Sequence, residues 1–177
     1  MENKFVELAL KRQSCREFSN KKIEKEVLDK ILDTALLAPS ACNSQPWKLV
    51  AVTEEDKCNA VRECLTVNGH NKFLKDVTTF VACVECEAVL KAGVESRFDR
   101  NRFVKYDVGQ LIAYLTLGAS AEGVESCIIG WMDEQRLKNE LNLADNEFCK
   151  IVVALGYSNI ETRKKSRKER TITVKYM

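Results

Sequence analysis

Three polar side chains recur at every second position near the start of the chain, in the pentapeptide RQSCR at residues 12–16. On an extended backbone, Arg12, Ser14 and Arg16 share one face, whereas Gln13 and Cys15 turn to the other. A helix would not align them, because residues two apart do not face each other on it. Guanidinium groups form forked, charge-assisted hydrogen bonds with oxyanions. If the stretch is extended, it therefore predicts a site for an anion such as a phosphate.

Neutral donors and acceptors are concentrated in the segment 37–47, LAPSACNSQPW. Its two prolines stiffen the chain and disfavour helix at the residue that precedes each of them. The side chains of Ser40, Asn43 and Gln45 offer hydrogen bonds of both kinds. Two interpretations stay open: a helix-to-strand loop without a ligand, or a wall for a planar heterocycle with hydrogen-bonding edges.

Cations dominate the segment RKKSRKER at residues 163–170, where six of them accompany one acid. Most such runs are solvated loops. A nucleic-acid contact is a second interpretation, although aromatic side chains do not interleave with the charges as stacking on bases requires. In a third, Lys165 or Arg167 folds back onto the anion that Arg12 and Arg16 hold.

Composition indicates an ordinary globular protein, with 177 residues of which 45% are hydrophobic and 31% charged. The formal charge of +2 is too small to favour a nucleic-acid partner. The N-terminus carries charges throughout, and no stretch of about 18 apolar residues occurs, so a cytoplasmic protein without membrane contact is expected. One domain is expected over residues 1–177, with 158–177 as a basic loop and an extending terminal strand.

Hydrophobic spacing predicts alternating helices and strands. The expected helices are a short one capped by Asn3 and those at 23–38, 54–65, 107–123 and 133–141, the last capped by Asp133. The expected strands are 47–53, 77–85, 125–131 and 150–157, with a loop at 67–76. The tail TITVKYM, residues 171–177, alternates apolar side chains beyond the basic loop. Such a tail is suited to pair with a sheet edge of its own chain or of a partner, and a homodimer is therefore expected.

Several catalytic signatures are absent from the sequence, among them G-x-G-x-x-G, G-x-S-x-G and a phosphate-binding loop with its lysine. His70 is the only histidine, and a solvated loop histidine is expected. Cys83 and Cys86 form a C-x-x-C pair within a predicted strand, where they face opposite sides, so no metal site is predicted. All eight cysteines are expected to be reduced thiols. An enzyme with so little acid–base equipment would depend on a cofactor.

Four ordered motifs resemble the family of FMN-dependent nitroreductases. The residues Arg12, Ser14, Arg16 and Phe18 are similar to its R-x-S-x-R-x-F signature, and APSACNSQPW at 38–47 is similar to its A-P-S-x-x-N-x-Q-P-W loop. Residues 106–133 resemble its central helix running into a G-L-G-x-x-x-I-G segment. VVALGY at 152–157, followed by a basic stretch, resembles its end.

The resemblance implies an α+β fold in which a central, mostly antiparallel sheet is flanked by helices and a C-terminal strand extends to the partner subunit. It implies a homodimer with FMN at the interface. The phosphate and ribityl end of FMN would be held by Arg12, Ser14, Arg16, Lys165 and Arg167. The ring would be lined by Pro39, Ser40, Asn43, Gln45 and the backbone around Ile128, Ile129 and Gly130. Gln13, where the family usually has a second basic residue, is counted with the cofactor-binding residues.

The implied activity is transfer of a hydride from NADH or NADPH through FMN to a nitroaromatic, a quinone or a similar small molecule. No catalytic side chain and no metal is expected. A flavin carrier or sensor without turnover shares every motif and stays open. Val124 and Glu125 replace the usual Leu-Gly of the central turn, and 67–76 matches only loosely, so the ring contacts of that segment stay open as well.

Overall fold

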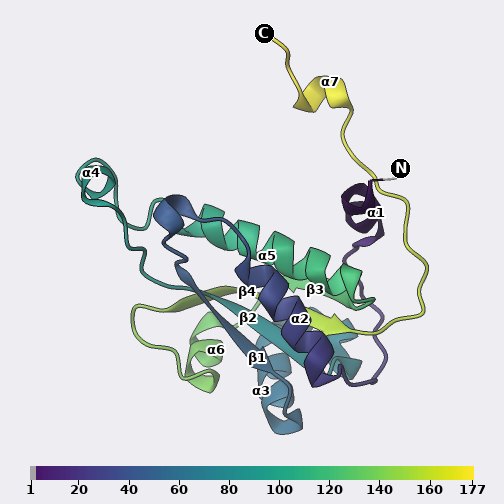
Figure 1. Ribbon diagram of the computed structural model, residues 1–177. Helices are drawn as coiled ribbons and strands as arrows, with labels where there is room; N and C mark the ends of the chain where they lie inside the picture. The colour runs from purple at the N-terminus through teal and green to yellow at the C-terminus, as the bar shows by residue number, and fades with distance from the viewer. Residues whose placement is uncertain (1–2) are drawn as a thin grey trace.

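The computed structural model describes residues 3–177, which are built around one sheet (Figure 1). Its four strands are β1 (Trp47–Val52), β2 (Thr79–Glu85), β3 (Glu125–Ile129) and β4 (Phe148–Gly156). They lie in the order β1-β2-β4-β3, and every neighbouring pair is antiparallel. The four predicted core strands are confirmed to within a few residues at their ends, and so is the α+β class.

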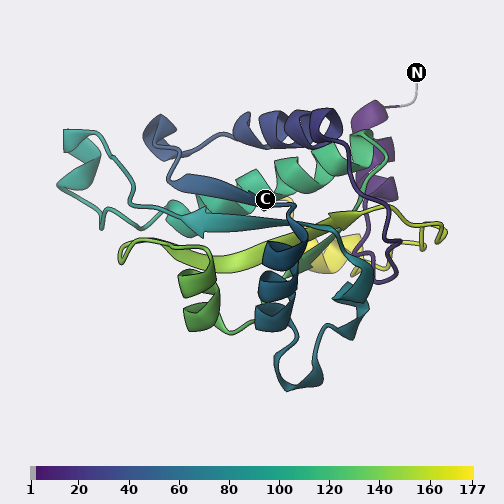
Figure 2. The same ribbon diagram turned by 90° about the horizontal axis from the view of Figure 1, so that it is seen from below.

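Helices cover both faces of the sheet (Figure 2). One face carries α2 (Lys25–Leu36) and α5 (Val104–Ala121), and the other carries α3 (Glu55–Leu65) and α6 (Glu134–Glu140). The predicted helices are confirmed, although α5 begins at Val104 rather than at Asp107. The side chain of Asp133 caps α6 as expected, accepting from the Arg136 amide at 3.0 Å.

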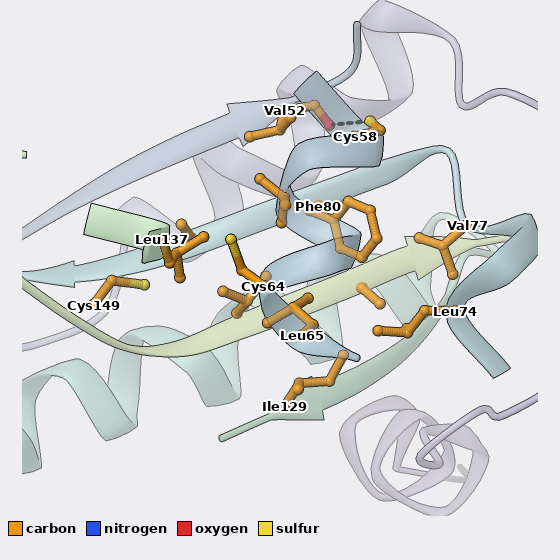
Figure 3. Packing of buried hydrophobic residues seen from close by; sticks show 14 of the residues in the cluster. Val52, Cys58, Cys64, Leu65, Leu74, Val77, Phe80, Ile129, Leu137 and Cys149 are labelled. Carbon is orange, nitrogen blue, oxygen red and sulfur yellow. Dashed lines mark hydrogen bonds between the residues drawn. The ribbon is translucent and has the colours of Figure 1, made fainter. Parts of the chain in front are cut away.

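Strand β2 runs through the middle of the sheet and feeds both cores. Residues 79–84 are all buried, and alternate side chains enter opposite layers. Val81 and Cys83 belong to the core under α2 and α5, whereas Phe80 belongs to the core under α3 and α6. Figure 3 shows Phe80 beside Leu65 of α3 in that second core. The continuous apolar run of this strand is therefore explained by burial on two faces.

Helices α2 and α5 pack closely on each other and run in opposite directions. An ion pair of 3.9 Å joins Lys30, in the middle of α2, to Glu122, just after α5. Further along α2 and earlier in α5, Gly118 faces Thr34, and a Cβ at position 118 would lie 3.0 Å from the Thr34 Cβ. Gly118 therefore permits the close approach of the two helices and is a packing position of α5.

The thiols follow the prediction of a reduced, hydrophobic set. All eight cysteines are free. Cys83 lies in the α2–α5 core and Cys86 packs against the opposite core, so the C-x-x-C pair does not converge. Within residues 3–177 no group of three or more potential metal ligands occurs. Burial raises the pKa of Cys64 and of Cys149 to about 11, which keeps both thiols protonated near neutral pH.

The prediction of a strand over 171–177 is wrong for the chain by itself. The short helix α7 (Arg170–Thr173) stands there instead, and residues 171–177 are all exposed. An alternating apolar strand needs a ladder to pair with. The outer edge of β3, which lies on the side of the tail, already carries a bridge between Ser14 and Ser126. The tail extends away from the sheet (Figure 1).

The remaining elements are short. Helix α1 (Lys4–Lys11) begins after its Asn3 cap as predicted, but none of its residues is buried. Segment 67–76, expected as a loop, contains two 3₁₀ helices, η2 (Val67–Gly69) and η3 (Lys72–Asp76). Helix α4 (Ala92–Glu95) and the 3₁₀ turn η1 (Ala41–Asn43) carry no periodic signal in the sequence and were not expected. Among residues 3–177, no helix combines the length and apolar character that crossing a bilayer requires.

Candidate functional site

The stretch 12–16 is extended and alternates as predicted. Gln13 and Cys15 are turned inward, with 4% and 0% of their surface exposed, while Arg12 and Ser14 are half-buried and Arg16 is exposed. The stretch lies along β3, because the Cys15 amide donates to the Ser126 carbonyl at 2.9 Å. The sheet edge therefore fixes which side chains face outward.

The basic segment near the C-terminus folds back onto this outward face. Arg163 Nη2 donates to the Ser14 carbonyl at 2.6 Å, and Lys165 Nζ donates to the Arg12 carbonyl. The two stretches line an open cavity of about 300 Å³, called the cationic groove below. Its lining residues are Arg12, Gln13, Ser14, Arg16, Arg163, Lys164, Lys165, Ser166 and Arg167. Of the three interpretations of the basic segment, this geometry agrees with the one in which the segment folds back toward the N-terminal arginines, and the shared anion stays a prediction.

Positive charge in the cationic groove exceeds the negative charge beside it. Burial lowers the pKa of Lys165, and the neighbouring Arg12 and Arg167 lower it further. Glu125 lies next to the groove, where burial raises its pKa against the pull of nearby cations that include Lys165. A bound anion would relieve this repulsion, and the fork-shaped donors suit a phosphate dianion.

Gln13 lines the groove, but its side chain points into the protein. The amide oxygen accepts from the backbone N–H and from Nε of Arg163, both at 3.2 Å, and the amide nitrogen donates to the Glu161 carbonyl at 3.3 Å. Because both ends of this amide already have partners, Gln13 could contact a cofactor only through its backbone. The sequence alternation predicted the inward orientation, but not these partners.

The proline-bracketed loop is held in a specific conformation. Cys42, Asn43 and Gln45 all have positive φ, between 48° and 55°. The Ser40 hydroxyl accepts from the Gln45 amide at 2.9 Å, and Gln45 Nε2 donates to the Asn43 carbonyl at 3.2 Å. Pro39, Asn43 and Gln45 are exposed. For Cys42 and Gln45 such backbone angles are sparsely populated and are maintained only where the surroundings enforce them, so the loop is held in one conformation.

Asp107, on the first turns of α5, fixes this loop and was missed by the sequence reading. Its side chain is buried, with 3% of its surface exposed, and both carboxylate oxygens accept from the Ala41 amide, at 3.1 and 3.2 Å. The available signal was a charged residue among the apolar positions of a helix, which commonly marks a buried carboxylate with a partner.

The proline-bracketed loop and the cationic groove lie at opposite ends of α5. The loop is attached at Asp107, and the groove lies beside Ser126, shortly after the helix ends at Ala121. The helix between Asp107 and Ala121 is about 20 Å long, at 1.5 Å per residue. Figure 1 shows this separation. The loop that follows α2 lies near one end of α5, and α1, which leads into the groove, lies near the other end. No residue of the loop lines the groove cavity. Within one chain, the two predicted halves of the site are apart.

The third predicted segment, 128–130, continues from the strand that carries the groove. Ile129 is buried, whereas Ile128 and Gly130 are exposed. Gly130 and Trp131 line an open cavity of about 520 Å³ together with Val67, Asn68, Met132, Asp133 and Glu134.

His70 lies beside this third segment. Its exposed ring lies 4.6 Å from the ring of Trp131, measured between centroids. The neighbouring Asn71 donates from Nδ2 to the Trp131 carbonyl at 3.3 Å. The lone histidine is thus exposed as predicted, and it contributes to an aromatic wall next to residues 128–130, a contact that the sequence did not suggest.

Comparison with known proteins agrees with the fold. A protein named NADH dehydrogenase from Thermus thermophilus is 29% identical over 174 residues, covering 84% of each chain. An oxygen-insensitive NADPH nitroreductase from Helicobacter acinonychis is 25% identical over 211 residues, covering 99% of this chain and 98% of that one. A solved structure described as an oxidoreductase containing FMN is 28% identical, with a TM-score of 0.73 over 85% of this chain and 75% of that chain.

The family assignment rests on the region that contains both the extended stretch and the proline-bracketed loop. The sequence model of the Nitroreductase family matches residues 9–157, which include both motifs, the whole sheet and the helices on its two faces. The basic segment that completes the cationic groove follows directly after this match. Fold, motif order and sequence similarity therefore agree, and the chain belongs to the Nitroreductase family.

Proposed function

We propose that this protein is an FMN-dependent oxidoreductase that passes a hydride from NADH or NADPH to a nitroaromatic, a quinone or a similar small acceptor. The observation that carries the proposal is the cationic groove, where both ends of the chain supply donors to one face. The similar proteins named NADH dehydrogenase, NADPH nitroreductase and oxidoreductase containing FMN support it.

The groove fits the phosphate end of FMN. A phosphate monoester carries close to two negative charges near pH 7, and the groove presents uncompensated cations with forked donors. Arg12, Ser14 and Arg16 would hold the phosphate and ribityl chain from one side, and Lys165 and Arg167 from the other. Gln13 would contribute through its backbone.

The flavin ring would contact two different segments. The backbone around Ile128, Ile129 and Gly130 continues from the groove along β3. Pro39, Ser40, Asn43 and Gln45 would line the ring from the loop that Asp107 holds. When bound, FMN supplies the acceptance and release of the hydride. The chain's own part is to orient the ring and to stabilise negative charge near it with fixed cations and backbone N–H groups.

A homodimer would bring the two segments together. Because the loop and the groove lie at opposite ends of α5, one cofactor that contacts both is most simply shared between two copies. Exposed apolar side chains on α1 and α5 and on the tail are available for such an interface. They are Phe5, Val6, Leu10, Tyr106, Tyr114, Ile172, Val174 and Tyr176.

The visible spectrum of the purified protein tests the proposal. We expect flavin absorbance, either as isolated or after incubation with FMN, and loss of that absorbance when NADH or NADPH is added without air. The double variant Arg12→Ala/Arg16→Ala is expected to lose bound FMN, since each charged hydrogen bond contributes on the order of 1.5–3 kcal/mol. The variant Lys57→Ala, on the exposed face of α3, is the matched control.

Two outcomes would contradict the proposal. A protein that stays colourless after incubation with FMN does not bind the cofactor. A yellow protein whose flavin is bleached by neither nicotinamide nucleotide binds FMN without the proposed turnover, as a carrier or sensor would.

A further inference from the structure

The basic segment is held in place by a neutral, buried side chain. Gln13 is 4% exposed and uses both ends of its amide: its oxygen accepts two hydrogen bonds from Arg163, and its nitrogen donates to the Glu161 carbonyl. These partners lie about 150 positions away in the sequence, in a stretch outside the helices and strands. The amide therefore joins the segment 161–167 to the N-terminal stretch as a peptide group would.

Few other side chains can make this set of contacts. A primary amide offers an acceptor and a donor on one planar group, whereas a lysine or arginine offers donors only and a carboxylate offers acceptors only. The contacts also set the position of the segment. With Arg163 fixed at Gln13, its guanidinium reaches the Ser14 carbonyl, and two residues later Lys165 reaches the Arg12 carbonyl.

Charge works against this arrangement before an anion arrives. The segment brings Arg163, Lys165 and Arg167 against the face that carries Arg12 and Arg16. The lowered pKa of Lys165, caused by burial and then by Arg12, Arg167 and Arg163, reflects the same repulsion. Two of the three hydrogen bonds join the neutral amide to backbone groups, the Arg163 N–H and the Glu161 carbonyl, and the third is accepted from the Arg163 guanidinium. Because the amide carries no charge, it adds none to the repulsion among the cations.

We propose that Gln13 is a positioning residue that docks residues 161–167, which include the start of the basic segment, in the absence of phosphate and thereby prearranges Lys165 and Arg167 for the cofactor. Removing the amide loosens the segment in the unliganded protein, because the two hydrogen bonds that remain, to the Ser14 and Arg12 carbonyls, are donated by Arg163 and Lys165, which are themselves among the repelling cations. A phosphate ligand must then order the segment as it binds, and the free energy that this ordering costs weakens its binding. The positioning role of Gln13 concerns the phosphate end of FMN and not its ring.

Amide hydrogen exchange on the protein without cofactor tests the docking directly. In Gln13→Met, which keeps the shape and removes both hydrogen-bonding groups, we expect the exchange rate of the Arg163 backbone N–H to rise at least about tenfold, because each lost hydrogen bond contributes around 1 kcal/mol. Raising the salt to about 1 M, where the screening length is only about 3 Å, is expected to restore part of the protection. Gln13→Glu keeps the acceptor and should keep that amide protected. Gln135→Met, on the exposed face of α6, is the matched control.

Binding measurements test the consequence for the cofactor and depend on the proposed function. For Gln13→Met we expect the Kd of FMN to rise about tenfold, which corresponds to about 1.4 kcal/mol, while the Kd of riboflavin, which has no phosphate, changes by less than about twofold. The variant Gln13→Glu should bind FMN more tightly than Gln13→Met.

Specific results would overturn the proposal. One is an Arg163 amide that stays protected in Gln13→Met, or that exchanges fast in Gln13→Glu. Another is an equal loss of affinity for FMN and riboflavin, which would indicate a general structural defect. If Gln13→Met does not fold, Gln13→Leu, which also removes both hydrogen-bonding groups, takes its place in the same two measurements and is judged against Gln13→Glu in the same way. If the unaltered protein binds neither flavin, the proposed function fails, but the exchange experiment still judges the role of Gln13.

Discussion

At the scale of single residues, Asp107 shows how one buried carboxylate controls a loop. Both of its oxygens accept from the Ala41 amide, and no other partner for that amide is present among the described residues. A buried group left without its partner costs more than the bond itself contributed. The loop that carries Ser40 and Asn43 therefore depends on a residue 66 positions away.

Replacing Asp107 tests this dependence. We expect Asp107→Ala to lower the free energy of unfolding by about 1–3 kcal/mol, because the Ala41 N–H loses its acceptor. Asp107→Asn keeps a carbonyl oxygen and should lose less than half as much. Urea denaturation measures both changes, and amide exchange at Ala41 locates them. Equal losses for the two variants would contradict the assigned role.

The ion pair between Lys48 and Glu147 gives the fold an acid-sensitive contact. Lys48 Nζ lies 2.6 Å from Glu147 Oε1, and the Ala144 amide donates to Glu147 Oε2 at 3.0 Å. The hydrogen bond from Lys48 lowers the pKa of Glu147 below its ordinary value of 4.5, and the one from Ala144 adds to this. A lowered carboxylate pKa contributes stability that is fully present above the ordinary value and is lost as the pH falls through the folded one.

We therefore expect Glu147→Gln to be less stable than the unaltered protein at pH 7, with the difference shrinking once the pH falls below 4.5. Urea denaturation at a series of pH values measures the difference. The variant Asp145→Asn, on the neighbouring turn, is the control, and its difference should not follow this course. A Glu147→Gln deficit that persists unchanged well below pH 4.5 would show that the carboxylate charge is not its source.

At the scale of elements, α5 holds the two halves of the site at a fixed separation, and α2 holds α5. The contact depends on Gly118, where an added Cβ would meet the Cβ and Cγ2 of Thr34, both at 3.0 Å. The Thr34 Cβ is fixed by the backbone, and the Thr34 hydroxyl donates to the Lys30 carbonyl at 2.8 Å, which holds the rotamer that places Cγ2 there. By contrast, a Cβ at Gly109 of the same helix would meet nothing within 4 Å.

Two alanine substitutions in α5 should therefore have opposite signs. Gly118→Ala is expected to lower the free energy of unfolding by about 1–3 kcal/mol, since the helices must separate to admit the methyl group. Gly109→Ala is expected to raise it by about 0.5–1 kcal/mol, because alanine has the higher helix propensity. Chemical denaturation measures both. A Gly118→Ala protein as stable as Gly109→Ala would contradict the close packing of α2 on α5.

At the scale of the whole molecule, the separation of the groove from the loop makes a prediction about subunits. In the proposed dimer each cofactor contacts the groove of one copy and the loop of the other. One variant therefore carries Arg12→Ala/Arg16→Ala, and a second carries Ser40→Ala/Asn43→Ala. In a mixed dimer of the two, one site takes both defects and the other takes none.

Mixing these two variants should restore activity. If subunits exchange at random, half of the dimers are mixed and each has one intact site of two, so about a quarter of the full NADH or NADPH oxidation rate is expected for a two-fold symmetric dimer. The rate is measured after equal amounts are unfolded and refolded together. A mixture no more active than the mean of the separate variants would contradict the shared site, and either variant refolded alone is the control.

The sequence by itself determined the local features of this protein. Periodicity placed the core strands and the main helices, because the local backbone geometry of a helix or strand decides which side chains share a face. The same rule gave the alternation of Arg12, Ser14 and Arg16 against Gln13 and Cys15, and residue chemistry gave the preference for an anion.

Only the tertiary structure decided how distant segments meet. Periodicity does not specify that Gln13 bonds to Arg163, that Asp107 holds Ala41, or that the proline-bracketed loop lies a helix length from the groove. Residues 171–177 form no strand within the single chain for the related reason that an alternating pattern states which face could be buried and not whether a sheet edge is within reach. Their pairing with a partner subunit stays a prediction. Such contacts depend on the packing of the whole chain, in which α2, α5 and the edge of β3 set the positions that local sequence leaves free.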